Sequence, residues 1–176
     1  ETSSRAVTLN LDALVQEGYV TPTAERSAIA DQFRVIKRPL LANATGKGAA
    51  PVEHGNLIMV TSAMPGEGKS FTAINLAMSM ALELDYRVLL VDADVSRPSI
   101  MKTLGLPPGP GLLDLLTNNT MEMSDTLLRT DPASGAITHL LELEIARALK
   151  PLTLKRLEEL HGLAGQRQQP VRNARS

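Results

Sequence analysis

Residues 63–70 read AMPGEGKS, and they follow the apolar run NLIMV at residues 56–60. The octapeptide has the order of a phosphate-binding loop, G-x-x-x-x-G-K-[ST], with Ala63 in place of the first glycine. In such a loop, small residues let backbone N–H groups approach phosphate oxygens, and the following helix adds its positive N-terminal dipole. The apolar run at residues 57–61 predicts a buried parallel strand, and residues 69–84 predict an amphipathic helix. This succession is the context that the motif requires.

A second motif, VLLVDAD at residues 88–94, combines another apolar strand with two carboxylates at its end. Asp92 and Asp94 are two residues apart, so on an extended strand both side chains would point to the same side. Ligands of open α/β folds bind at this carboxyl edge of the sheet. Because acids beside a triphosphate need a cation between them, we expect Mg²⁺ there. The alternative is a strand end with two solvated acids.

The order strand, loop, helix, strand is a βαβ unit and predicts an α/β fold. We expect a P-loop NTPase-like parallel sheet flanked by helices and incomplete on its C-terminal side. Residues 24–41 predict a preceding helix with Ile29, Phe33, Ile36 and Leu40 on one face, which Pro39 ends or kinks.

Short helices are predicted at residues 98–104 and 112–116, and no further strand is expected beyond Asp94. The expected domain organisation has four segments: an N-terminal arm or linker (1–23), a P-loop nucleotide-binding domain (24–130), a divergent helical segment (131–165) and a disordered basic tail (166–176).

Composition narrows the function classes. The chain has 176 residues and a net charge of −1, which gives no reason to expect nucleic acid as a partner. It contains no cysteine, so disulfides and thiol chemistry are excluded within it, in keeping with a cytoplasmic protein. Its apolar runs are shorter than the roughly 20 residues that span a bilayer. Its first residues, ETSSRAV, lack the apolar core of a secretion signal.

The stretches TSAMPGEGKSFTAINLA (61–77) and VLLVDADVSRPS (88–99) together resemble the cytoplasmic kinase domain of bacterial tyrosine kinases. These autokinases are paired with polysaccharide chain-length regulators in capsule and exopolysaccharide export. Among them, the sequence is most similar to the exosortase-associated autokinases. Partition and septum-positioning ATPases are the runner-up. They carry a signature lysine in the loop, where this chain has Met64 and Pro65.

The resemblance implies a role for each motif residue. Lys69 would stabilise the transferring phosphate, Ser70 and Asp92 would hold Mg²⁺, and Asp92 would also assist in deprotonating a tyrosine. Asp94 matches the second acid of the family's second motif and completes the implied catalytic set. The residues implied to bind ATP are Pro65, Gly66, Glu67, Gly68, Lys69, Ser70 and Phe71.

The resemblance also implies partners. The family's E-x-x-R-x-x-R pattern for ring assembly has Asp31, Arg34 and Lys37 at the matching positions, and lysine lacks the bidentate fork of arginine. The alternative for this trio is a solvated helix face. The implied partners are a nucleotide, further copies of the chain and an inner-membrane chain-length regulator. The implied location is the cytoplasmic face of the membrane.

Two parts of the family pattern are missing from this sequence. The third motif, an apolar strand ending in Asp, is absent, and Tyr19 and Tyr86 are the only tyrosines, so the C-terminal tyrosine cluster is absent too. We therefore expect a tyrosine autokinase domain whose catalysis is impaired by C-terminal truncation or divergence. The alternatives are a non-catalytic nucleotide-binding regulatory module and a partition-type ATPase.

Overall fold

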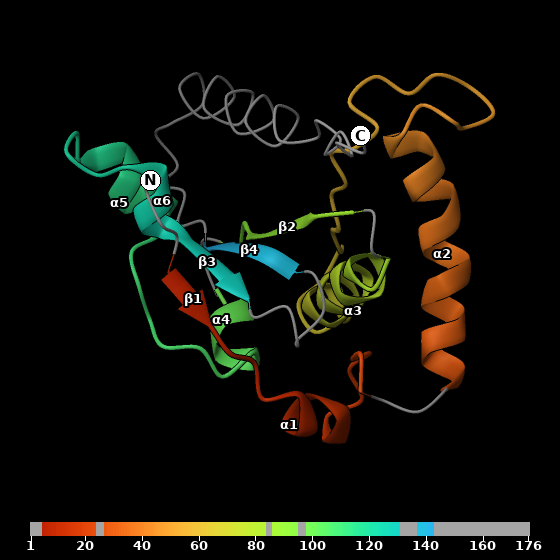
Figure 1. The fold of residues 1–176 in the computed structure, drawn as a ribbon, viewed down its shortest axis with the longest axis horizontal. Coiled ribbons are helices and arrows are strands. Elements are labelled where there is room, and N and C mark those ends of the chain that lie inside the picture. Colours follow the sequence, from red (N-terminus) through yellow and green to blue (C-terminus); the bar gives the residue numbers. More distant parts are fainter. Residues whose placement is uncertain (1–4, 24–26, 84–85, 95–97, 131–136, 143–176) are drawn as a thin grey trace, which may run out of the picture. The chain divides into compact units, whose positions relative to one another are not determined.

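The computed structural model describes residues 5–23, 27–83, 86–94, 98–130 and 137–142. All of them belong to a single unit, Glu1–Glu144. Figure 1 shows the elements in chain order: β1 (Arg5–Val7), α1 (Leu11–Gln16), α2 (Ala28–Ala44), α3 (Lys69–Ala81), β2 (Val88–Asp92), α4 (Ile100–Thr103), α5 (Leu112–Thr117), α6 (Met123–Thr126), β3 (Leu127–Thr130) and β4 (Ile137–Glu142). Helices and strands are mixed along the chain, which confirms the α/β class. In the described ranges, no helix is long and apolar enough to cross a membrane.

The four strands form one sheet in the order β1-β3-β4-β2 (Figure 1). β1 pairs with β3, and β2 pairs with β4, in parallel. β3 and β4 pair antiparallel, so the expectation of an all-parallel sheet is wrong at this position. The reason is chain length. β3 ends at Thr130 and β4 begins at Ile137, and so short a connection cannot make the crossover of a dozen or more residues that parallel neighbours need.

β3 and β4 also overturn the expectation of no strand beyond Asp94, and β4 overturns a helical reading of residues 137–142. A short apolar run fits helix and strand periodicity equally well, so the pattern alone did not decide. Strand pairing determines that residues 137–142 form a strand, because β4 lies between β2 and β3 and pairs with both. The remaining residues of the predicted helical segment, 143–165, and the predicted tail, 166–176, lie outside the described residues.

The interpretation of residues 1–23 as an arm or linker does not hold for residues 5–23. β1 is an edge strand of the sheet, and α1 begins after Asn10, whose side chain accepts a hydrogen bond from the Ala13 N–H at 3.1 Å. Leu9 and Leu14 are buried in the main apolar cluster. Apolar spacing over so short a stretch did not reveal that the segment contributes to the core.

The strand expected at residues 57–61 is not formed, and the backbone there is irregular. Leu57 is 72% exposed and Met59 is 83% exposed, whereas Val60 packs partly against the cluster that contains Phe33. A strand needs a neighbour to satisfy its backbone groups, and none of the described strands pairs with this segment. An apolar run predicts burial, but it does not supply the pairing partner.

α2 begins after Ser27, whose Oγ accepts a hydrogen bond from the Ala30 N–H at 3.2 Å. Pro39 lies inside this helix, which continues to Ala44, so of the two predicted effects, an end or a kink, the end at Pro39 is wrong. Proline removes one N–H from the helix ladder, and its partner residue Val35 is 70% exposed, so water can reach the freed carbonyl. Phe33 is buried as predicted, but Ile36 is 47% exposed and departs from the predicted face.

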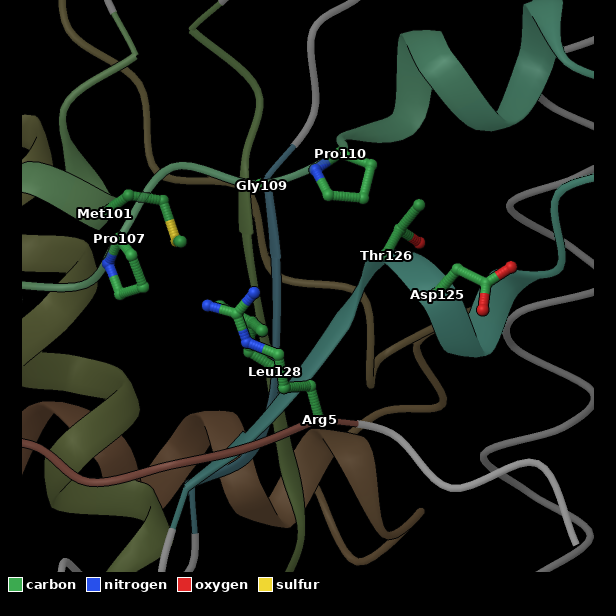
Figure 2. Close-up of a pocket in the computed structure, with 8 residues that line it drawn as sticks. All are labelled: Arg5, Met101, Pro107, Gly109, Pro110, Asp125, Thr126 and Leu128. Carbon is green, nitrogen blue, oxygen red and sulfur yellow. The ribbon is translucent and has the colours of Figure 1, made fainter.

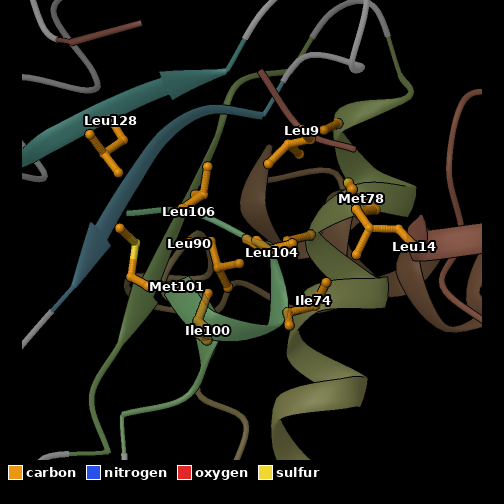
Figure 3. Close-up of a cluster of buried hydrophobic side chains, with 12 residues drawn as sticks. Leu9, Leu14, Ile74, Met78, Leu90, Ile100, Met101, Leu104, Leu106 and Leu128 are labelled. Atoms are coloured by element: carbon orange, nitrogen blue, oxygen red, sulfur yellow. The ribbon is translucent and has the colours of Figure 1, made fainter. Parts of the chain in front are cut away.

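α3 carries the centre of the core. Ile74 and Met78 are completely or almost completely buried, and Figure 3 shows them among apolar side chains from α1, β2 and α4. Burial of side chains of this size stabilises a fold by about 1.5–3 kcal/mol each. Ala77 and Ala81 are buried as well, while Leu82 is 37% exposed. This packing fixes the helix that follows the phosphate loop.

α2 is tied to α3 through a buried lysine. Lys37 is 5% exposed, and its Nζ donates hydrogen bonds to the Ser79 carbonyl oxygen and to Glu83 Oε1, the latter at 2.8 Å. A buried ammonium needs such partners, because its desolvation is otherwise very costly. Lys37 therefore serves the packing of this chain's own helices.

The Lys37–Glu83 contact predicts a pH dependence of stability. The hydrogen bond and charge of Lys37 lower the pKa of Glu83 below its ordinary value of 4.5, with smaller help from Arg34 and Arg38. A carboxylate with a lowered folded-state pKa stabilises the fold above its unfolded pKa and loses this contribution as the pH falls through the folded pKa. We expect Glu83→Gln to be less stable than wild type in urea at neutral pH, and the difference to vanish in acid. An equal difference at all pH values would contradict this account.

Candidate functional site

The loop at residues 62–68 owes its path to two glycines. Gly66 and Gly68 have φ of 89° and 87°, the left-handed region that a side chain makes costly. The loop is also held from within, because Glu67 Oε2 accepts a hydrogen bond from the Met64 N–H at 3.0 Å. Ser62 Oγ donates to the Met64 carbonyl at 3.1 Å. The predicted loop is therefore exposed, irregular and locally fixed.

α3 begins directly after this loop, at Lys69. Gly68 is the N-cap residue, and the Thr72 N–H donates to the Gly68 carbonyl at 2.8 Å. The N–H groups of the first turn have no carbonyl partner within the helix, and a glycine cap offers no side chain to accept from them. Together with the helix dipole, they form a favourable position for phosphate oxygens.

The second motif meets the loop through an ion pair. Lys69 Nζ lies 2.7 Å from Asp94 Oδ2, and both side chains are partly exposed. β2 ends at Asp92, so Asp94 lies beyond the strand, and the expectation that both acids stand on one extended strand does not hold. Asp94 approaches α3, whereas Asp92 binds the start of α4.

Asp92 is the most deeply buried acid of the site, with an exposed fraction of 4%. Its Oδ2 accepts hydrogen bonds from the N–H groups of Ser99 at 2.8 Å and Ile100 at 3.0 Å. Its Oδ1 accepts from the Asp94 N–H at 3.2 Å. The carboxylate therefore holds the residues after β2 and the start of α4 in place.

Ser99 joins the two motifs and was missed from the sequence. Its Oγ lies 3.1 Å from the Ser70 Oγ at the start of α3, while its N–H binds Asp92. The available signal was its place as a serine at the start of the short helix predicted at residues 98–104, since serine is a preferred N-cap residue. That signal indicates a cap, and the contact with Ser70 depends on the fold.

The residues present fit a Mg²⁺ ion shared with phosphate. Ser70 supplies a hydroxyl and Asp92 a carboxylate, and Mg²⁺ prefers such oxygen ligands. Each carboxylate oxygen can accept two hydrogen bonds, and Asp92 Oδ1 makes a single one to the described residues, so a lone pair remains. Over the described ranges no three His, Cys, Asp or Glu side chains cluster as a metal site.

Phe71, the last residue of the predicted nucleotide cradle, contacts the N-terminal segment. Its ring lies 5.0 Å from the ring of Tyr19, and its carbonyl accepts from Asn75 Nδ2 at 3.0 Å. The fully buried Asn75 also accepts from the Val20 N–H at 2.6 Å. Burial, and to a lesser degree the nearby Glu17 charge, raises the pKa of Tyr19. These contacts hold residues 19–20 against the helix that carries Lys69 and Ser70.

The trio predicted for oligomer contacts is divided by the structure. Arg34 Nη1 lies 3.8 Å from Asp31 Oδ1, and both side chains are more than half exposed. Lys37 is buried against α3 and does not share this surface. Asp31 and Arg34 thus remain the exposed members.

Figure 2 shows a small cavity away from the two motifs, with a volume of about 20 Å³. Its lining comes from β1, α4, α6 and β3, including Arg5, Met101, Asp125 and Leu128. A cavity of this size holds about one water molecule, which excludes a nucleotide. The candidate site is therefore the surface formed by the loop, the start of α3 and the end of β2.

Comparison with known proteins agrees with this geometry. A family model described as "ParA: NUBPL iron-transfer P-loop NTPase" matches residues 53–111. The tyrosine-protein kinase YwqD of Bacillus subtilis is 32% identical over 120 residues, covering 68% of this chain and 48% of the relative. The tyrosine-protein kinase ptk of Acinetobacter johnsonii is 39% identical over 80 residues, covering 46% of this chain and 10% of the relative.

A third relative is the succinoglycan biosynthesis transport protein ExoP of Rhizobium meliloti, 33% identical over 93 residues, or 53% of this chain and 11% of the relative. The chain thus spans about half of YwqD and about a tenth of the other two. No solved structure matches it. The phosphate loop, its helix and these matches together identify the chain as a ParA-type P-loop NTPase domain with several relatives named bacterial tyrosine-protein kinases.

Proposed function

We propose that this domain binds Mg-ATP and belongs to a protein-tyrosine autokinase of exopolysaccharide production. The observation that carries the proposal is the meeting of the two motifs: Lys69 pairs with Asp94 at 2.7 Å, and Ser70 and Asp92 both contact Ser99. Phosphoryl transfer depends mainly on positioning and electrostatic stabilisation, and these contacts bring together a cation, a hydroxyl and two carboxylates.

Each residue has a role in the proposal. Backbone N–H groups of residues 66–71 bind the phosphates, and the Lys69 ammonium, after leaving Asp94, neutralises the outer phosphate. Ser70 and Asp92 hold Mg²⁺, which on binding would screen the phosphate charge. Asp94, released from Lys69, is the more exposed carboxylate and is available to orient or deprotonate an incoming tyrosine hydroxyl.

Relatives support the biological setting that we propose. Of the three relatives described above, two are named tyrosine-protein kinases, and one is named a succinoglycan biosynthesis transport protein. We propose an inner-membrane chain-length regulator as partner and the cytoplasmic face of the membrane as location, as the family resemblance implies. Self-assembly would use the exposed pair of Asp31 and Arg34, without Lys37. The matching family model is described by iron transfer, but this sequence contains no cysteine, the usual ligand of iron–sulfur clusters.

The proposal is tested in two measurements on the whole chain. Calorimetry should detect ATP binding that strengthens when Mg²⁺ is added. Incubation with radiolabelled ATP, followed by phosphoamino-acid analysis, should detect phosphotyrosine on this chain or on an added tyrosine-containing acceptor. Binding without phosphotyrosine would support the regulatory-module alternative, and ATP hydrolysis without phosphotyrosine would support a partition-type ATPase. Absence of ATP binding would contradict every form of the proposal.

A further inference from the structure

We propose that Ser99 is a positioning residue that prepares Ser70 and Asp92 to hold the Mg²⁺ of the bound nucleotide. This inference rests on the proposed function and adds a residue to it. Ser99 contacts one metal donor from each motif: its Oγ lies 3.1 Å from Ser70 Oγ, and its N–H lies 2.8 Å from Asp92 Oδ2.

The Ser99 hydroxyl does not make the capping hydrogen bond that its position before α4 predicts. Serine before a helix normally accepts a hydrogen bond from an N–H in the first turn. Ser99 is the N-cap residue of α4, yet within the described part of the chain its side chain makes no capping hydrogen bond. The N–H of Ile100, the first residue of α4, donates to Asp92 at 3.0 Å. The hydroxyl of Ser99 lies beside that of Ser70, in a partly buried position.

Once a cation is present, hydrogen-bond chemistry determines which hydroxyl donates in the contact between Ser70 and Ser99. A serine hydroxyl has one proton and two lone pairs. A cation attracts a lone pair of Ser70 Oγ and repels its proton, so the proton must point to another acceptor. Ser99 Oγ is that acceptor. A donor whose proton already has a partner is oriented for the metal, in the manner by which outer-shell groups tune metal ligands.

Loss of this acceptor should weaken the binding of Mg²⁺ and leave the affinity for nucleotide without Mg²⁺ unchanged. In Ser99→Ala, we expect affinity for a fluorescent ATP analogue in excess EDTA to be unchanged, since the loop and Lys69 are intact. The Mg²⁺ concentration that strengthens binding should rise about tenfold, the lower end of the effect of losing an outer-shell partner. The unfolding midpoint should be unchanged, because Asp92 binds the backbone of residue 99. Ser99→Thr should restore the wild-type Mg²⁺ requirement, because it retains the hydroxyl.

A matched control is Ser27→Ala, which removes a hydroxyl that accepts the Ala30 N–H at the start of α2, outside the candidate site, and should leave the Mg²⁺ requirement unchanged. The proposal is overturned if Ser99→Ala keeps the wild-type Mg²⁺ requirement, if threonine fails to restore it, or if the variant loses binding equally with and without Mg²⁺. Failure of the wild-type chain to bind the analogue under either condition would instead overturn the proposed function.

Discussion

Lys69→Met is expected to weaken ATP binding by about 10- to 100-fold, because hydrogen bonds to charged groups are worth roughly 1.5–3 kcal/mol. Lys69 is the first residue of α3 and directly follows the loop. In the absence of nucleotide it pairs with Asp94 at 2.7 Å, so binding exchanges one anionic partner for another. The measurement is a titration with a fluorescent ATP analogue.

Two controls distinguish this loss of ATP affinity from a loss of stability and from a change in net charge. The Lys69–Asp94 pair is partly exposed, so its loss should lower the free energy of unfolding by less than about 1 kcal/mol. Lys102→Met removes the same charge from an exposed residue of α4 and should change ATP affinity little. Equal weakening by both substitutions would mean that the loop recognises charge in general, and Lys69 would lose its assigned role.

Local features of this site were predictable from the sequence. Gly66 and Gly68 adopt left-handed φ values because the loop requires them, and α3 begins at the lysine that the motif places there. The short helix α4 also lies within the range predicted at residues 98–104. Such features depend on backbone preferences over a few positions, which the sequence states directly.

Features that depend on distant partners were not predictable. Residues 57–61 have the composition of a buried strand and lack a partner among the described strands, whereas residues 137–142 fit a helix and pair with two strands. The burial of Lys37 depends on the Ser79 carbonyl, which the helix pattern of α2 does not reveal. Pairing between distant segments is a tertiary effect that overrides local propensity.

Asp92 combines both kinds of information. Its place at the end of an apolar run predicted a metal ligand, but its contacts also make it a structural residue. It is buried, and three backbone N–H groups donate to it from Asp94, Ser99 and Ile100. A metal ligand held in this way loses little entropy when the cation binds, because its orientation is already fixed. The same contacts mean that its removal affects folding as well as binding.

Asp92→Ala is therefore expected to lower the free energy of unfolding by about 3–5 kcal/mol, because each buried donor left without a partner costs roughly 1–3 kcal/mol. This is a large part of the 5–15 kcal/mol that stabilises a typical domain. Urea denaturation followed by circular dichroism measures it. Asp125→Ala is the matched control: Asp125 is exposed and accepts one backbone N–H, from Glu122 at 2.9 Å. Its loss should cost about 1 kcal/mol.

Asp92→Asn separates the two roles of this residue. The amide oxygen can still accept the Ser99 and Ile100 N–H groups, while the amide nitrogen faces the Asp94 N–H, so we expect most of the stability to remain. The negative charge is gone, so Mg²⁺ should no longer strengthen ATP binding. If Asp92→Asn keeps the wild-type Mg²⁺ effect, Asp92 is a structural residue alone. If Asp92→Ala is as stable as Asp125→Ala, its hydrogen bonds do not hold the turn, and the account of how the two motifs are joined must be abandoned.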